Sequence, residues 1–296
     1  MNISDLKGSI VALVTPMHAD GSVDWDALEA LVEWHISEGT HGIVAVGTTG
    51  ESATLTTEEH LQVIDFCIKQ VAGRVPVLAG TGSNSTMEAI EMTREAKILG
   101  ADAALIVVPY YNKPTQKGLL AHYTAIADAV DIQQVLYNVP GRTALSLSNE
   151  IAEQLSHHDN IVAIKDATGD LALGADLIKR VGSRMTVLSG DDPSALELMK
   201  LGARGNISVT ANVVPRAMSQ VFGLAHDGKF DEAQQIHEQI KHLHQDLFCE
   251  PNPIVVKYAL NRMQKIGNGI RLPMTWIEPE HEPAIDAALK QAKVIN

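Results

Sequence analysis

Short apolar runs rich in Val, Ile and Ala alternate with amphipathic segments along most of the chain, and this alternation limits the fold more than any other feature. The candidate strands are Ser9–Val14, Gly42–Val46, Val75–Ala79, Ala103–Val108, Gln134–Asn138, Ile161–Lys165, Met185–Ser189 and Gly205–Val209. Helical patterns separate them, among them Asp26–Glu38, Thr57–Val71, Thr86–Leu99 and Lys117–Ala129. Strands and helices in regular alternation favour parallel strands joined by right-handed crossovers.

Eight strand–helix units fit a closed (β/α)8 barrel, a TIM barrel, which we predict for residues 1–224. The alternative is an open doubly wound sheet. The segment Gly80–Ser85 begins like a dinucleotide-binding fingerprint but lacks its third glycine, which weakens that alternative.

The strand pattern stops after about Ala225. The segments Phe230–Phe248, Pro253–Met263 and Glu282–Ala292 have helical patterns and are joined by stretches that contain Pro and Gly. We therefore expect residues 225–296 to form a helical region appended to the barrel.

Composition and charge disfavour several classes of partner. The 36 acidic residues outnumber the 23 basic ones, which disfavours nucleic acid and anionic membranes as partners.

The two cysteines, Cys67 and Cys249, lack metal-ligand spacing and are typical of free thiols in a reducing cytoplasm. Residues Met1–Lys7 lack the basic and apolar regions of a signal peptide, and no apolar run approaches the ~20 residues of a membrane span. We expect a cytoplasmic protein.

Lys165 ends the buried run Ile161–Ile164, an unusual place for a charged side chain. Burial of an ammonium group is unfavourable unless the group is paired, neutralised or used in chemistry. A neutral amine is a nucleophile toward carbonyl compounds, so the position suggests Schiff-base chemistry. The alternative is a lysine that extends from the strand end into a salt bridge.

Other polar groups follow strands that would end at the same barrel mouth. These segments are Gly47–Glu51, Pro109–Pro114, Tyr137–Thr143 and Ser189–Asp192. Tyr137 is either a half-buried aromatic or a proton relay, and Arg142 is either a solvated charge or a carboxylate clamp. The pair Asp191 and Asp192 more often caps the next helix than binds a metal.

No metal site is predicted from the histidines. His237-Glu238 precedes His242 by five residues instead of the four of a zinc-protease helix, and His157-His158 lies in a polar turn. Structural or solvated histidines explain both patterns better.

Together, four motifs resemble the dihydrodipicolinate synthase/N-acetylneuraminate lyase family of class I aldolase-type (β/α)8 barrels. They are Gly47-Thr48-Thr49-Gly50-Glu51, Tyr110-Tyr111-Asn112-Lys113-Pro114, Tyr137-Asn138-Val139-Pro140-Gly141-Arg142-Thr143 and Lys165-Asp166-Ala167-Thr168-Gly169. They occur in the order and at the spacing of the family, and the resemblance runs from about Gly8 to Leu289.

The resemblance implies a Schiff-base-forming lyase that needs no cofactor. Lys165 would form an imine with pyruvate, and the derived enamine would attack L-aspartate 4-semialdehyde, a step toward diaminopimelate and lysine. Thr48 and Thr49 would hold the pyruvate carboxylate. Gly190 and Ile207 would lend backbone groups near the imine.

The resemblance also implies a homo-oligomer. Tyr137 would relay protons at the imine, linked to Thr48 and to Tyr111. In this family the tyrosine that matches Tyr111 comes from a neighbouring subunit, usually within a tetramer built as a dimer of dimers.

Arg142 separates the two branches of the family. In the synthases an arginine at this place binds the semialdehyde carboxylate, and the lyases lack it there; Thr49 points the same way. The alternatives are another pyruvate-dependent class I aldolase, such as a sugar-acid or N-acetylneuraminate lyase, a sensor of pyruvate or lysine without turnover, and a metal-dependent aldolase.

A lysine effector site of the family maps onto a further set of residues. The set comprises Ser52, Ala53, His60, Asn84, Glu88 and Tyr110. Glu88 would bind the ammonium of L-lysine, but it is also a favourable first-turn residue of a helix. Thr57 departs from the pattern, because lysine-sensitive members commonly carry a histidine there.

Overall fold

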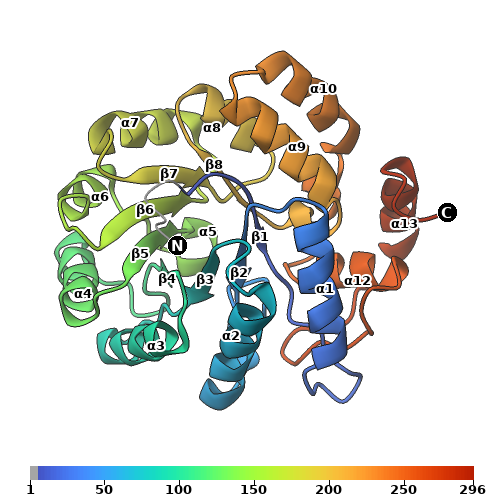
Figure 1. The fold of residues 1–296 in the computed structure, drawn as a ribbon, viewed down its shortest axis with the longest axis horizontal. Helices are drawn as coiled ribbons and strands as arrows, with labels where there is room; N and C mark the ends of the chain where they lie inside the picture. The colour runs from blue at the N-terminus through green and yellow to red at the C-terminus, as the bar shows by residue number, and fades with distance from the viewer. Residues whose placement is uncertain (1–5) are drawn as a thin grey trace.

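The computed structural model describes residues 6–296 and contains a closed barrel of parallel strands that pair in chain order (Figure 1). The strands are β1 (Gly8–Ala12), β2 (Gly42–Ala45), β3 (Val77–Gly80), β4 (Ala103–Val107), β5 (Gln133–Asn138), β6 (Ile161–Asp166), β7 (Thr186–Ser189) and β8 (Gly205–Ser208). β1 pairs with β8 and closes the ring, which confirms the predicted barrel and excludes the open sheet. The prediction that residues 1–7 form no signal peptide concerns a segment of which residues 1–5 lie outside the described residues.

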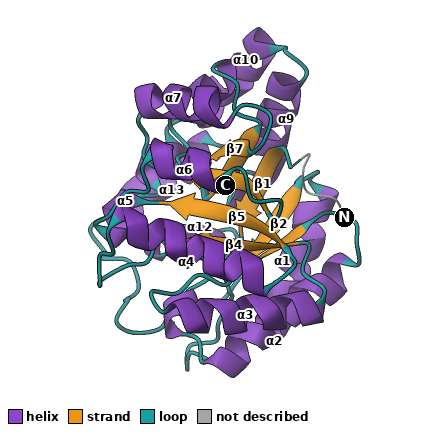
Figure 2. Ribbon diagram, turned by 90° about the vertical axis from the view of Figure 1, so that its left-hand side faces the viewer, coloured by secondary structure: helices purple, strands orange, loops and turns teal. Residues whose placement is uncertain are grey.

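Helices surround the barrel, as the side view in Figure 2 shows. Those of the barrel are α1 (Trp25–Ser37), α2 (Thr57–Val71), α3 (Thr86–Leu99), α4 (Gln116–Ala129), α5 (Pro140–Thr143), α6 (Asn149–Leu155), α7 (Leu171–Val181), α8 (Ala195–Lys200) and α9 (Pro215–His226). Then follow α10 (Phe230–Ile240), α11 (Leu243–Asp246), α12 (Ile254–Arg262) and α13 (Glu282–Gln291). Two 3-10 turns, η2 (Ser52–Thr54) and η3 (Thr210–Asn212), lie in the connections that follow β2 and β8. None of the helices in residues 6–296 is both long and apolar enough to cross a membrane.

The expected elements are confirmed with small shifts at their ends, except for one helix. The prediction of a single helix over Phe230–Phe248 is wrong, because this segment forms two helices, α10 and α11. At the break, His242 Nε2 lies 3.1 Å from the carbonyl oxygen of Ala288. The bend lets Leu243 and Leu247 point into the core. The predicted division after residue 224 falls within the last turn of α9.

The capping patterns explain where two barrel helices begin. Thr56 and Glu59 form a full capping box at the start of α2. Ser85 caps α3 by accepting the backbone N–H of Glu88. The Glu88 side chain does not complete a second box; it accepts a hydrogen bond of 2.6 Å from the Ser83 hydroxyl.

The barrel interior is packed with side chains and is not a pore. Each strand contributes to this inner core: Ile10, Val44, Leu78, Leu105, Val135, Ala163, Leu188 and Ile207. A second, larger apolar core lies between the strands and the helices. Because the interior is filled, chemistry is confined to the carboxyl-terminal end of the strands.

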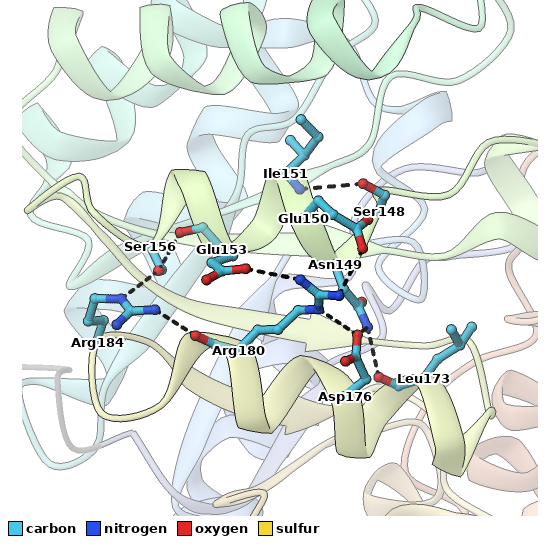
Figure 3. A network of polar contacts seen from close by, with 10 residues as sticks. All are labelled: Ser148, Asn149, Glu150, Ile151, Glu153, Ser156, Leu173, Asp176, Arg180 and Arg184. Carbon is cyan, nitrogen blue, oxygen red and sulfur yellow. Dashed lines mark hydrogen bonds and ion pairs between the residues drawn. The ribbon is translucent and has the colours of Figure 1, made fainter.

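A polar network joins the two helices on either side of β6 (Figure 3). Arg180 of α7 forms ion pairs with Glu150 and Glu153 of α6, each at 3.1 Å. Asn149 of α6 donates to the carboxylate of Asp176 of α7 at 2.8 Å. The helices before and after β6 are thus tied to each other, which restrains the strand that carries Lys165.

The C-terminal region is attached to the loop after β2 by buried charges. Lys257 of α12 and Glu51 form an ion pair in which both side chains are inaccessible to solvent. The backbone N–H of Arg271 donates to the same carboxylate at 3.1 Å, and its guanidinium pairs with Glu59 at 2.6 Å. The last helices are therefore part of the wall around the barrel mouth.

Replacement of Lys257 by Met leaves the Glu51 carboxylate buried without its cation. We expect a loss of about 3–5 kcal/mol in the free energy of unfolding, measured by urea denaturation. The double variant Glu51→Gln, Lys257→Met should recover most of this loss, because no charge remains buried. The matched control is Lys290→Met at an exposed position of α13. Equal stability of Lys257→Met and the control would contradict the assignment.

Candidate active site

Lys165 lies at the mouth of the barrel and is 6% exposed. It stands beside Tyr137 of the neighbouring strand, and its Nζ is 4.1 Å from the centre of the Tyr137 ring. The ring face attracts a cation. Within residues 6–296, no carboxylate lies within ion-pair distance of the Lys165 ammonium. The amine is thus held in place without being consumed in a salt bridge.

Gly190, which follows β7, packs directly against the lysine. A Cβ atom at Gly190 would lie 2.7 Å from Lys165 Cε and 2.8 Å from the Cβ of Ala167. Such distances are too short for any side chain, so glycine is required here for steric reasons. The contact leaves the aliphatic part of Lys165 little freedom and directs the amine into the open mouth.

A cavity of about 160 Å³ surrounds the amine. Of the residues predicted from the sequence, six line this cavity: Lys165, Tyr137, Thr48, Thr49, Arg142 and Gly190.

Two other residues predicted from the sequence, Ile207 and Tyr111, do not line the cavity. Ile207 belongs to the inner core, where it is paired with Ile10 of β1, and Val209 lines the cavity at the end of that strand. Tyr111 is 90% exposed.

Strained backbone surrounds the site. Val46, immediately after β2, has a φ of 48°, which is highly unusual for a β-branched residue, and Glu51 at the other end of the same loop has a φ of 57°. Tyr111 has a φ of 71°. Strain of this kind is retained where the surrounding structure enforces it, and it is concentrated at functional sites.

Asn252, in the segment before α12, was missed by the sequence reasoning, which treated this segment as a connection. Its side-chain Nδ2 donates to Thr49 Oγ1 at 2.9 Å, and its backbone carbonyl accepts from Arg142 Nη2 at 3.1 Å. It is 4% exposed and lines the cavity. An asparagine before a proline carried no signal for these contacts.

Asp191 and Asp192 both act as hydrogen-bond acceptors. Asp191 accepts from the backbone N–H and the hydroxyl of Ser194, next to the start of α8. The buried Asp192 accepts from Asn206 at 2.6 Å and from the backbone N–H of Thr210 at 2.9 Å. Asp191 therefore caps the turn before α8, and Asp192 joins the loops after β7 and β8.

The histidines have structural contacts. The His237 ring packs against that of His244 at 5.0 Å between centres, and burial lowers the pKa of His237 to about 4. No cluster of three potential metal-ligating side chains is found among residues 6–296.

A second cavity of about 440 Å³ adjoins the first. The predicted effector residues Ser52, Ala53, His60, Glu88 and Tyr110 line it. Asn84 is not part of the lining and instead donates to the Tyr110 carbonyl at 3.2 Å. The two cavities share Thr48, Val139, Arg142 and Asn252. A ligand in the larger cavity would therefore touch residues of the smaller one.

His60 and Glu88 are two of the ionisable residues that line the larger cavity, beside Glu51 and Arg142. Burial lowers the pKa of His60, and its Nε2 lies 2.7 Å from the Gly80 carbonyl oxygen. The Nε2–H group of His60 thus donates to the backbone and fixes the orientation of the ring. Glu88 remains exposed, with its carboxylate bound to the Ser83 hydroxyl.

Comparison with known proteins places these features in context. The model of the dihydrodipicolinate synthetase family matches residues 5–292. The 4-hydroxy-tetrahydrodipicolinate synthase of Psychrobacter arcticus is 59% identical over 290 residues, which is 98% of this chain and 96% of the relative.

Solved structures agree with that relationship. The chloride-inhibited dihydrodipicolinate synthase from Acinetobacter baumannii, complexed with pyruvate, superposes with a TM-score of 0.97 at 56% identity and covers 98% of this chain and 100% of its own. The enzyme from Cyanidioschyzon merolae with lysine bound has a TM-score of 0.94 at 38% identity, covering 98% and 99%.

Proposed function

The chain belongs to the dihydrodipicolinate synthetase family, and from that premise we infer that it condenses pyruvate with L-aspartate 4-semialdehyde through a Schiff base on Lys165. The observation that carries the role of Lys165 is its geometry. It is a buried amine without a counter-ion in residues 6–296, held between the Tyr137 ring and Gly190 at the mouth of the barrel. The place of action we propose is the cytoplasm, since the reaction belongs to amino-acid biosynthesis.

The proposed reaction begins with the bond between Lys165 Nζ and the keto carbon of pyruvate, followed by loss of water to give the imine. Loss of a methyl proton gives an enamine, whose carbon attacks the aldehyde, and the aldehyde oxygen takes up a proton. The amino group of the second substrate then attacks the imine carbon, which closes the ring and releases the Lys165 amine. The product is 4-hydroxy-tetrahydrodipicolinate, and no cofactor enters the scheme.

Side chains of the cavity divide the remaining tasks. Thr48 and Thr49, in the loop after β2, are suited to hold the pyruvate carboxylate through hydroxyl and backbone groups. Gly190 can contribute its backbone beside the imine. Tyr137 lies next to the amine and can move protons to and from the imine and the aldehyde oxygen.

Arg142 supports the semialdehyde as second substrate. It lines both cavities, and one of its nitrogen atoms is anchored on the Asn252 carbonyl, which leaves the rest of the planar guanidinium for a carboxylate. A terminal carboxylate is present in the semialdehyde. A sugar-aldehyde acceptor, as in the lyase branch, would need neutral hydrogen-bonding groups there.

The first test follows pyruvate consumption with L-aspartate 4-semialdehyde and with a panel of sugar aldehydes. We expect turnover with the semialdehyde only, none in Lys165→Ala, and borohydride-trapped pyruvate on Lys165 by mass spectrometry. Arg142→Ala should keep the trapped adduct but raise KM for the semialdehyde roughly 10- to 100-fold, since a charge-assisted bidentate contact is lost. Turnover with a sugar aldehyde instead would overturn the choice of substrate.

We further propose that the protein is a homo-oligomer, a tetramer built as a dimer of dimers. Tyr111 is strained and 90% exposed in the single chain, so it does not reach its own Lys165 site. A second exposed apolar surface is offered by Leu171 and Leu173 in the first turn of α7. Two separate surfaces are what a dimer of dimers requires.

Complementation tests the contribution of Tyr111 from a neighbouring subunit. Lys165→Ala and Tyr111→Ala should each be nearly inactive. Subunits mixed at equal amounts and reassembled should regain about a quarter of the wild-type activity, since half of the dimers are mixed and each has one complete site. Analytical ultracentrifugation gives the assembly state. Absence of regain in a confirmed mixed oligomer would show that each chain uses its own Tyr111.

The larger cavity is proposed to bind L-lysine as an inhibitor. Glu88 supplies an acid for one ammonium group, and the hydroxyl groups of Ser52 and Tyr110 supply donors for the carboxylate. The shared lining residues Thr48 and Arg142 provide the physical route to the active site. Thr57 also lines this cavity, at the position where lysine-sensitive members of the family commonly carry a histidine.

Inhibition by millimolar lysine tests this site. Glu88→Gln should raise the half-inhibitory concentration of lysine at least about 10-fold, because the charge that attracts an ammonium is lost. Glu91→Gln, at an exposed place on the same helix, is the matched control and should behave as wild type. No response of the wild type at millimolar lysine would contradict the proposal.

A further inference from the structure

Asn252 lies at the junction of the C-terminal region and the barrel mouth, far from the four motifs in sequence. We propose that Asn252 is a positioning residue that fixes the direction of the Thr49 hydroxyl proton, so that Thr49 donates to the substrate carboxylate; the inference rests on the proposed function of the site. The contacts of Asn252 come from two separate atoms: the side-chain Nδ2 reaches Thr49, and the backbone carbonyl reaches Arg142.

The direction of the side-chain hydrogen bond is the central point. A threonine hydroxyl can donate one hydrogen bond and accept others. Because Asn252 Nδ2 donates to Thr49 Oγ1, the oxygen of Thr49 is engaged as an acceptor and its proton is free to point elsewhere. Thr49 is 3% exposed, and its hydroxyl has no acceptor among residues 6–296. A carboxylate in the cavity would be that acceptor.

The position of Asn252 is set by its burial and by the helix that follows it. It is 4% exposed, and its Oδ1 is buried without a hydrogen-bond partner in the described part of the chain. A buried polar atom without a partner is unfavourable. The following helix is held by the buried pair between Lys257 and Glu51, and Glu51 lies in the same loop as Thr49. The C-terminal region thus sets the position of the amide relative to that loop.

The same residue affects the two substrates unequally. The contact with Thr49 uses the side chain, and the contact with Arg142 uses the backbone. Truncation of the side chain therefore removes the restraint on the pyruvate carboxylate site and leaves the anchor of Arg142. Truncation of the Asn252 side chain should therefore raise KM for pyruvate more than KM for the semialdehyde.

The test compares Asn252→Ala with the isosteric Asn252→Asp. In the Ala variant we expect KM for pyruvate to rise about 5- to 20-fold, with KM for the semialdehyde within about 2-fold of wild type. In the Asp variant the carboxylate accepts from Thr49 and draws its proton away from the substrate, so the rise should exceed that of Ala. If Asn252 only fills space, the isosteric Asp variant would be milder than Ala, and the proposal would be wrong.

A double-mutant cycle supplies an independent readout. Once Thr49 is replaced by Val, Asn252→Ala should change KM for pyruvate by less than about 2-fold, because the partner is already gone. Asn261→Ala is the matched control, since the side chain of Asn261, in the following helix α12, donates to the Ile266 carbonyl at 3.0 Å and does not line the cavity. Effects that add in the cycle would contradict the proposal.

Borohydride trapping separates this proposal from the proposed function. The Asn252 variants should form the pyruvate adduct on Lys165 at saturating pyruvate, with thermal unfolding as a check on folding. Absence of the adduct in the wild type would contradict the proposed function itself. Normal trapping together with an unchanged KM for pyruvate in Asn252→Ala would contradict the positioning role alone.

Discussion

Closure of the barrel through the pairing of β1 with β8 is the constraint on which the rest of the structure depends. It forces alternate side chains of every strand into one interior, where apolar residues such as Val135 and Ala163 fill the centre. One step further along the same face, at the carboxyl-terminal end, stand Tyr137 and Lys165, paired in register. The same alternation that builds the core therefore places the ring and the amine in contact.

This arrangement resolves the energetic problem that a buried lysine poses. A salt bridge would make the amine stable but unreactive, because its proton would be held by the partner charge. Here the tyrosine ring and the close approach of Gly190 hold the side chain by packing. The nearby carboxylates have other partners: Glu51 pairs with Lys257, and Asp191, at the edge of the cavity, accepts from the Ser194 hydroxyl. The amine keeps its position without losing its availability.

The sequence was sufficient for what depends on local pattern. Strand and helix positions follow from apolar periodicity and caps, and the mouth residues follow from the rule that parallel strands end at one rim. Thus the sequence alone predicts that Lys165, Thr48 and Arg142 lie together, and all three line one cavity. The break between α10 and α11 could not, because it depends on the contact of His242 with the distant Ala288.

Asn252 shows why the rest of the site could not be predicted. Its hydrogen bond to Thr49 spans 203 residues of sequence, and neither residue carries a local pattern that identifies the other. The contact exists because the buried Lys257–Glu51 pair fixes α12 over the loop after β2. The mouth of the barrel is therefore lined partly by a segment that contributes no strand to the barrel. The C-terminal region accordingly contributes Phe248 and Asn252 to the wall of the candidate site.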